Sequence, residues 1–260
     1  MDWDRILHLN KLPSHPKLLV IGGPPRCGKS TLAHEVMLTY GIDVVSGDAI
    51  RRVLASTGMS FLPIDPDTWA VNTAEFIHAC KDRDSKVANA CTVYAEQFLG
   101  DYKSIMVEGC LWADDLERFA LPIRPRNGVD RLVQPEVLTV HLFNNAPLEA
   151  EQERLRAQCK EDPASWLNRY TAKQLDDFAI ANRARGLKMA KIAREYGAVS
   201  LENERSIMNI FSNKRSCLQV IIDAAELEGG MREMHYLASE LISYFFHNPL
   251  HESHSSQFIS

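Results

Sequence analysis

Short apolar runs alternate with longer amphipathic stretches between about residues 17 and 202 of the chain. The runs contain few polar residues, whereas a strand with one face in water would alternate apolar and polar positions. We therefore predict strands that are covered on both faces. They lie at 18–21, 42–45, 104–107, 137–143 and 198–201.

Helical periodicity fills the intervals between the predicted strands. After the first strand, apolar residues recur three or four positions apart and form one stripe, made of Leu32, Ala33, Val36, Met37 and Tyr40. Gly41 follows, where a helix C-terminus favours glycine. The same spacing returns in 87–98 and 189–196. This alternation predicts a doubly wound α/β fold, with a parallel sheet of about five strands and helices on both faces.

The pattern changes after Glu202. Apolar residues recur at helical spacing in 218–225 and again in 234–245, so we predict two amphipathic helices and no further strand. These helices either pack on the α/β core as an extension or form a surface for a protein partner or a homo-oligomer. We divide the chain into a lead at 1–16, an α/β domain at 17–204, a C-terminal helical extension at 205–246 and a disordered tail at 247–260.

Composition narrows the function classes. The chain has 260 residues, of which 29 are basic and 34 acidic, for a net charge of −5. This balance gives no overall positive field for nucleic acid or an anionic membrane. The N-terminus is acidic where a signal peptide is basic, and no apolar run approaches the roughly 20 residues that span a bilayer. We expect a cytoplasmic protein with reduced cysteines, because none of the six forms a Cys-x-x-Cys pair.

A glycine-rich turn interrupts the pattern between the first strand and the first helix. Residues 23–30, GPPRCGKS, fit the phosphate-binding pattern G-x-x-x-x-G-K-[ST] at every fixed position. Glycine lets such a loop curl with its N–H groups inward, at the positive end of the following helix, where a triphosphate fits. We expect Lys29 to reach the β- and γ-phosphates and the Ser30 hydroxyl to bind Mg²⁺. The predicted nucleotide site comprises Gly23, Pro24, Pro25, Arg26, Cys27, Gly28, Lys29, Ser30 and Thr31.

With this loop, the chain resembles the P-loop kinases of small molecules. These include the nucleoside monophosphate, shikimate, gluconate and adenylylsulfate kinases and the zeta-toxin relatives. The resemblance covers about residues 17–202 and is strong at the loop, moderate at 43–52 and 104–112 and weak elsewhere. It implies a P-loop NTPase fold and a kinase-like domain at 17–204.

The segment VVSGDAIRR resembles the family's acceptor element, a strand end followed by an acidic residue and a helix with arginines. By this resemblance Asp48 would orient or deprotonate the acceptor hydroxyl, and Arg51 or Arg52 would bind an anionic group on it. A carboxylate at the mouth of the sheet can indeed accept the proton that an attacking hydroxyl loses. The alternative is that Asp48 caps a helix beginning at Ala49 and that the arginines form a solvated face.

Glu108 ends the third predicted strand, at the sheet edge where open α/β sheets gather ligand groups. Family members often have an acidic residue followed by glycine there, which Glu108 and Gly109 resemble. The resemblance implies that Glu108 holds Mg²⁺ through water or positions the acceptor. The alternative is a polar strand end that caps a helix near 113–119.

The resembling kinases close an arginine-bearing lid over the phosphates between their fourth and fifth strands. Here that interval is 144–197, and its second half is basic. We predict that at least one of Arg169, Arg183 and Arg185 contacts the transferring phosphate, with Arg183 and Arg185 as the leading candidates. Most other charges of the interval are expected to be solvated.

The leading hypothesis is an ATP- and Mg²⁺-dependent kinase that transfers the γ-phosphate to a hydroxyl or phosphate of a small molecule. One alternative is a nucleotide-dependent switch or regulatory ATPase that acts through its C-terminal helices. Another is a nucleic-acid 5′-end kinase, which the net acidity argues against. Nothing in the sequence names the acceptor.

Overall fold

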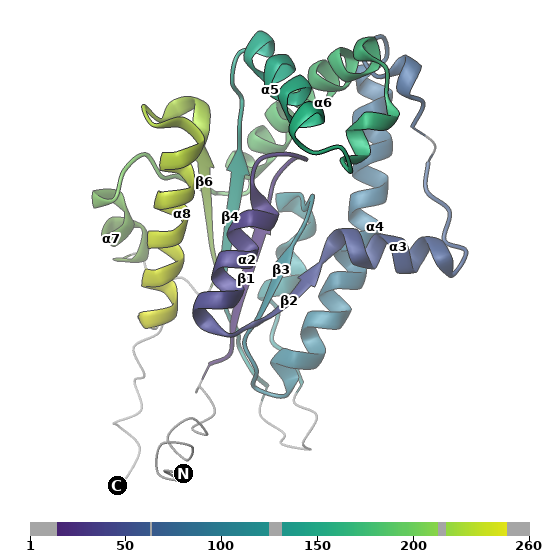
Figure 1. Cartoon of the computed structure of the whole chain (residues 1–260). Coiled ribbons are helices and arrows are strands. Elements are labelled where there is room, and N and C mark those ends of the chain that lie inside the picture. The colour runs from purple at the N-terminus through teal and green to yellow at the C-terminus, as the bar shows by residue number, and fades with distance from the viewer. Residues whose placement is uncertain (1–14, 63, 125–131, 213–216, 249–260) are drawn as a thin grey trace, which may run out of the picture.

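The computed structural model describes residues 15–62, 64–124, 132–212 and 217–248 (Figure 1). The predicted lead at 1–16 and the predicted tail at 247–260 therefore lie mostly outside the described residues. In the described part of the chain, no helix is long and apolar enough to cross a membrane. All six cysteines are unpaired with one another in the structure.

A six-stranded sheet forms the centre of the molecule, and every strand pairs parallel to its neighbours. The strand order is β2-β3-β1-β4-β6-β5. The strands are β1 (Lys17–Gly22), β2 (Asp43–Ser46), β3 (Ile105–Glu108), β4 (Glu136–Phe143), β5 (Val199–Ser200) and β6 (Cys217–Asp223). All eight residues of β4 are buried, as expected of a strand covered on both faces.

Helices cover both faces of this sheet, which confirms the predicted α/β fold. On one face α2 (Lys29–Tyr40), α7 (Arg205–Ser212) and α8 (Gly230–His247) contribute to a single apolar cluster with the strands. On the other face α3 (Gly47–Ser56), α4 (Thr73–Gly100) and α6 (Ala172–Glu195) pack. Helix α2 ends where predicted, because Gly41 adopts a φ of 63° and donates its N–H to the Met37 carbonyl.

A second lobe stands above the carboxyl ends of the strands (Figure 1). It combines α5 (Leu148–Glu161), the short helix η4 (Trp166–Arg169) and the first half of α6 with the N-terminal end of α4. Thr171 and Gln174 form a reciprocal capping box at the start of α6. Trp69, Phe76 and Phe178 lie in the apolar core of this lobe. The interval predicted to be a lid is therefore an ordered helical lobe.

The prediction for 218–225 is wrong. This segment was expected to be an amphipathic helix, but 217–223 forms β6, which lies between β4 and β5 in the sheet. Because both faces of β6 are covered, apolar residues such as Leu218, Ile221 and Ile222 follow one another without strict alternation, and their spacing imitates a helix. The predicted helix at 234–245 is correct and lies within α8.

Candidate functional site

The glycine-rich turn lies between β1 and α2, at the carboxyl edge of the sheet. Gly23 and Gly28 have positive φ values, 137° and 88°, and Arg26 has a φ of 69°. A methyl carbon on Gly23 would lie 2.1 Å from the Leu142 carbonyl oxygen, so only glycine fits there. In the described part of the chain, the backbone N–H groups of residues 26–28 have no hydrogen-bond partner. The loop therefore offers free donors at the start of a helix, which suits a phosphate group.

Lys29 is buried and bends back over this loop. Its Nζ donates a hydrogen bond to the Pro24 carbonyl oxygen, 2.5 Å away, and lies 3.6 Å from the Cys27 sulfur. Burial lowers the pKa of Lys29, but the neighbouring Cys27, Cys110 and Glu108 more than offset this, and the pKa lies above its ordinary value. The ammonium group is therefore charged and is held against the loop by the Pro24 carbonyl.

Glu108, at the end of β3, faces Ser30 in the first turn of α2. Glu108 is opposite Ile21 of β1 in the sheet register, and its carboxylate lies 3.5 Å from the Ser30 hydroxyl. The Ser46 hydroxyl donates to the same carboxylate at 2.8 Å. One hydroxyl and one carboxylate beside a phosphate site match the few protein ligands that Mg²⁺ takes. Within the described residues no group of three or more His, Cys, Asp or Glu could hold a metal.

Asp48 lies in the first turn of α3, close to the end of β2. The helix begins at Gly47 and its N-cap is Ser46, so the alternative in which Asp48 caps a helix starting at Ala49 is wrong. The Asp48 side chain is 78% exposed, and its carboxylate lies 3.4 Å from Nε of Arg51. Arg52, the next residue, is exposed. Asp48 and Arg51 thus form one charged pair at the carboxyl edge of the sheet.

The alternative role of Glu108 as a helix cap also differs from the structure. Residues near 113–119 form two short 3₁₀ turns, Ala113–Asp115 and Glu117–Ala120, and the first is preceded by Trp112 as its N-cap. Glu108 instead receives hydrogen bonds from two serines and is 8% exposed.

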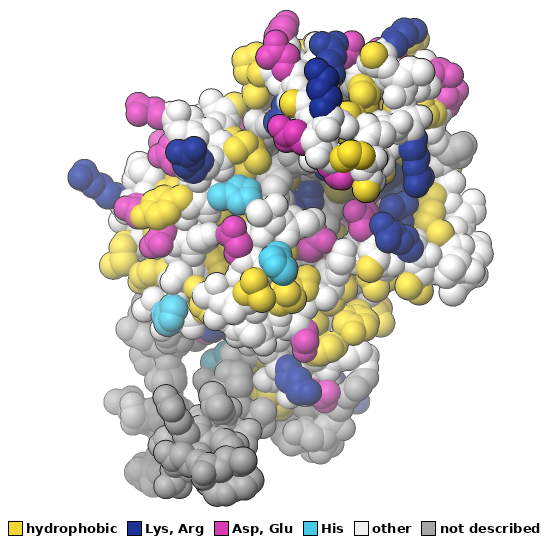
Figure 2. All heavy atoms as spheres, viewed as in Figure 1, with side chains coloured by type: hydrophobic (Ala, Val, Ile, Leu, Met, Phe, Trp, Pro, Cys, Tyr) yellow, Lys and Arg dark blue, Asp and Glu magenta, His cyan; other side chains and the backbone are white. Residues whose placement is uncertain are grey.

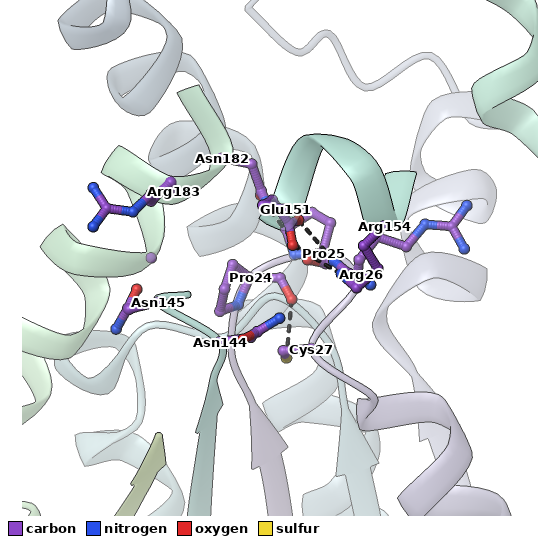
Figure 3. Close-up of a pocket in the computed structure, with 11 residues that line it drawn as sticks. Pro24, Pro25, Arg26, Cys27, Asn144, Asn145, Glu151, Arg154, Asn182 and Arg183 are labelled. Carbon is purple, nitrogen blue, oxygen red and sulfur yellow. Dashed lines mark hydrogen bonds and ion pairs between the residues drawn. The ribbon is translucent and has the colours of Figure 1, made fainter. Parts of the chain in front are cut away.

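The upper lobe packs directly on the glycine-rich loop (Figure 3). Asn182 of α6 donates to the Pro25 carbonyl oxygen at 3.2 Å, and Gly186 lies against Pro24 so closely that a methyl group there would approach its ring to 3.4 Å. Arg26 donates to the Ser165 hydroxyl at 3.0 Å and stacks over the Trp166 ring. A small pocket lies between the loop and the lobe, and residues of both line it.

The three candidate lid arginines occupy different environments. Arg169 is exposed at the end of η4. Arg183 donates from Nε to the Ala146 carbonyl oxygen, and its guanidinium points away from the loop in Figure 3. Arg185 is 1% exposed and is bound to the carboxylate of Asp84 on α4. Burial alone would lower the pKa of Arg185, but the neighbouring Asp84 reverses this and the pKa lies above its ordinary value.

Asp84, Trp112 and Asn182 are site residues that sequence reasoning missed. Asp84 and Asn182 are polar residues at 4% and 5% exposure, and each lies in a long helix whose charged residues mostly face water. A polar residue on the apolar stripe of α4 was the only available signal, since Asp84 lies three residues before Val87.

Charged side chains of both signs are interspersed over the upper lobe on the face shown in Figure 2. This distribution agrees with the net charge of −5.

This chain resembles known proteins only in structure, and only distantly. No family model matches the chain, and no curated protein matches it. A gluconokinase from Sinorhizobium meliloti 1021 is 15% identical over 90% of this chain and 98% of its own, with a TM-score of 0.37. A sugar kinase from Janibacter sp. HTCC2649 is 18% identical over 70% of this chain and 98% of its own, with a TM-score of 0.33. The Pnkp1/Rnl/Hen1 RNA repair complex contains a chain that is 15% identical over 90% of this one and 79% of its own, with a TM-score of 0.39. Because these TM-scores are all below 0.5, we infer no function from these similarities.

Proposed function

We propose that this protein is an ATP- and Mg²⁺-dependent phosphotransferase that moves the γ-phosphate to a hydroxyl or phosphate of a small-molecule acceptor. One observation carries the proposal: free loop N–H groups, the buried Lys29 and the facing Ser30 and Glu108 meet at one edge of the sheet. Each group suits a different part of a magnesium-bound nucleotide.

The loop and Lys29 would bind the phosphates. The N–H groups of residues 26–28 donate to phosphate oxygens, and Lys29 exchanges its hydrogen bond with the Pro24 carbonyl for one with the β- or γ-phosphate. Ser30 and Glu108 would hold Mg²⁺, directly and through water respectively, and the ion neutralises charge on the β- and γ-phosphates when bound. Of these groups, Lys29 would have to change its hydrogen-bond partner on binding.

Asp48 would act on the acceptor. Its carboxylate is exposed at the carboxyl edge of the sheet, and Arg51 lies beside it. A carboxylate in this position can accept the proton of an attacking hydroxyl, and Arg51 or Arg52 can bind an anionic group of the acceptor. Arg185, close to Lys29, is the lid arginine best placed to stabilise the transferring phosphate.

Purified protein with Mg·ATP, incubated with pools of metabolites and with a 5′-hydroxyl oligonucleotide, tests the proposal. We expect acceptor-dependent ADP release with one small molecule and none with the Lys29→Ala variant, because no neighbouring cation can replace Lys29 at the phosphates. Transfer to the oligonucleotide alone would favour a nucleic-acid 5′-end kinase. Nucleotide binding with no transfer to any acceptor would favour a regulatory ATPase or switch. Near-normal turnover of Lys29→Ala would contradict a kinase of this type.

A further inference from the structure

A buried ion cluster joins α4, α6 and the segment after β3. The Asp84 carboxylate accepts a hydrogen bond from Nη2 of Arg185 at 2.5 Å and one from Nε1 of Trp112 at 2.9 Å, both on the same oxygen. Its other oxygen accepts from Nε and Nη2 of Arg83 at 3.1 and 3.0 Å. The side chains of Arg185 and Asp84 are 1% and 5% exposed. Two guanidinium groups thus share a single carboxylate in the interior.

The cluster lies next to the proposed phosphate site. Arg185 is close enough to Lys29 that its charge acts to lower the pKa of that lysine. Its neighbour Gly186 packs against Pro24 of the loop, and Asn182, one turn earlier in α6, donates to Pro25. Arg185 is therefore bound to α4 through Asp84, and its neighbours in α6 contact the loop.

One donor of Arg185 is unused. Its Nε is buried and, among the described residues, has no hydrogen-bond partner. A buried polar group without a partner is costly, and a cluster with two cations and one anion has one positive charge in excess. An anion at the loop would supply both the missing acceptor and the missing negative charge.

Resting on the proposed function, we propose that Asp84 is a positioning residue that holds the Arg185 guanidinium toward the transferring phosphate. An arginine side chain is long and flexible, and fixing it before the reaction removes an ordering cost from the chemical step. Asp84 binds one edge of the guanidinium, and Trp112 fixes the carboxylate in turn. The Nε–H is left to donate to a phosphate oxygen.

The test compares Asp84→Asn, Asp84→Glu, Arg185→Lys and the double variant of Asp84→Asn with Arg185→Lys. Asp82→Asn is the matched control, because Asp82 lies on the same helix and its carboxylate pairs with Lys86, 2.8 Å away. For each protein the dissociation constant of Mg·ADP is measured, together with kcat per nucleotide-binding site, for the acceptor or for slow transfer to water. Counting binding sites removes the effect of any unfolded fraction.

We expect Asp84→Asn to leave the Mg·ADP dissociation constant within about threefold while kcat falls about a hundredfold, since the contact matters mainly to the transferring group. The kcat of Arg185→Lys should fall by a similar factor. The kcat of the double variant should be no lower than that of either single variant, because both substitutions break the same Asp84–Arg185 contact. Asp84→Glu should have a higher kcat than Asp84→Asn, and Asp82→Asn should have the kcat of the parent protein.

Two results would overturn the inference. One is a kcat for Asp84→Asn within a few-fold of the parent once it is normalised to binding sites. The other is a double variant whose loss is the product of the two single losses, because Asp84 would then act independently of Arg185. A parent protein that binds Mg·ADP but transfers phosphate to neither an acceptor nor water would instead contradict the proposed function, and the inference would fall with it.

Discussion

Alanine at the two invariant positions of the loop pattern, Gly23 and Gly28, should destabilise the protein for different reasons. At Gly23 the added methyl carbon would meet the Leu142 carbonyl oxygen of β4 at 2.1 Å. At Gly28 it would meet the imidazole of His235 on α8, also at 2.1 Å. A strand carbonyl in the middle of a sheet cannot move, whereas a side chain can rotate away.

The expected costs follow from this difference. A non-glycine residue at the Gly23 φ of 137° costs about 1–3 kcal/mol before the clash with β4 is counted, so we expect the larger loss there. At Gly28 the left-handed conformation costs about 1–2 kcal/mol, and displacing His235 from its rotamer adds about 0.5–1.5 kcal/mol. In the His235→Ala background the second part disappears, so Gly28→Ala should cost about 1 kcal/mol less there.

Urea unfolding of the parent, the two alanine variants, His235→Ala and the Gly28→Ala double variant measures these free energies. Midpoints are compared between proteins whose unfolding free energy depends on urea concentration with the same slope. A change in midpoint then reports a change in stability and not a change in the unfolded state. The reasoning is refuted if Gly23→Ala costs less than Gly28→Ala, or if His235→Ala leaves the cost of Gly28→Ala unchanged.

Three further predictions concern catalysis and pH. Asp48→Asn should leave ATP affinity nearly unchanged and lower turnover about a hundredfold, as loss of a general base does; an unchanged rate with the true acceptor would exclude that role. Among alanine variants of Arg169, Arg183 and Arg185, turnover should fall about 10³-fold at one position, which we expect to be Arg185, and weakly at the others. Steady-state turnover of folded, ATP-binding variants tests this prediction. A turnover within a few-fold of the parent in all three variants and in the triple variant would contradict it. Burial lowers the pKa of His141 from 6.5 to about 4. Between these two pH values the imidazole is protonated in the unfolded chain but not in the folded one. The free energy of unfolding should therefore drop by up to about 3 kcal/mol between pH 7 and pH 4 on account of this residue, and urea unfolding of His141→Gln should show a smaller drop.

The fold was predictable where local patterns decide it. The apolar runs that precede the glycine-rich turn and Gly109 correspond to β1 and β3, and Gly41 ends α2 as expected. The failure at β6 has a physical cause: a strand buried on both faces loses the polar alternation that separates a strand from a helix. Its partners β4 and β5 are far away in sequence, so no local feature shows the pairing.

The candidate site likewise contains some residues that local sequence predicts and others that it does not. The loop residues follow from the chemistry of phosphate binding, which fixes glycine, lysine and serine at set spacings. Asp84 was missed because its importance comes from its contact with Arg185, and the two are 101 residues apart in the chain. Likewise, nothing in the sequence distinguishes Arg185 from Arg183. Only packing shows that one is buried beside Asp84 and the other bonds to the carbonyl of Ala146.

The position of β6 also affects how the chain can fold as it is synthesised. The two-residue strand β5 pairs with β6 and with no other strand among the described residues, and β6 itself inserts against the buried strand β4. When residues up to about 212 have formed, β4 still presents an unpaired edge, which is a template for wrong pairing with another chain. Covering this edge requires Val137 of β4 to pair with Cys217 of β6, 80 positions later in the chain. Such a step is slow, because the entropy of closing a long loop is lost before the pairing stabilises it. Nascent chains that stall before residue 217 should therefore be the species most prone to aggregate.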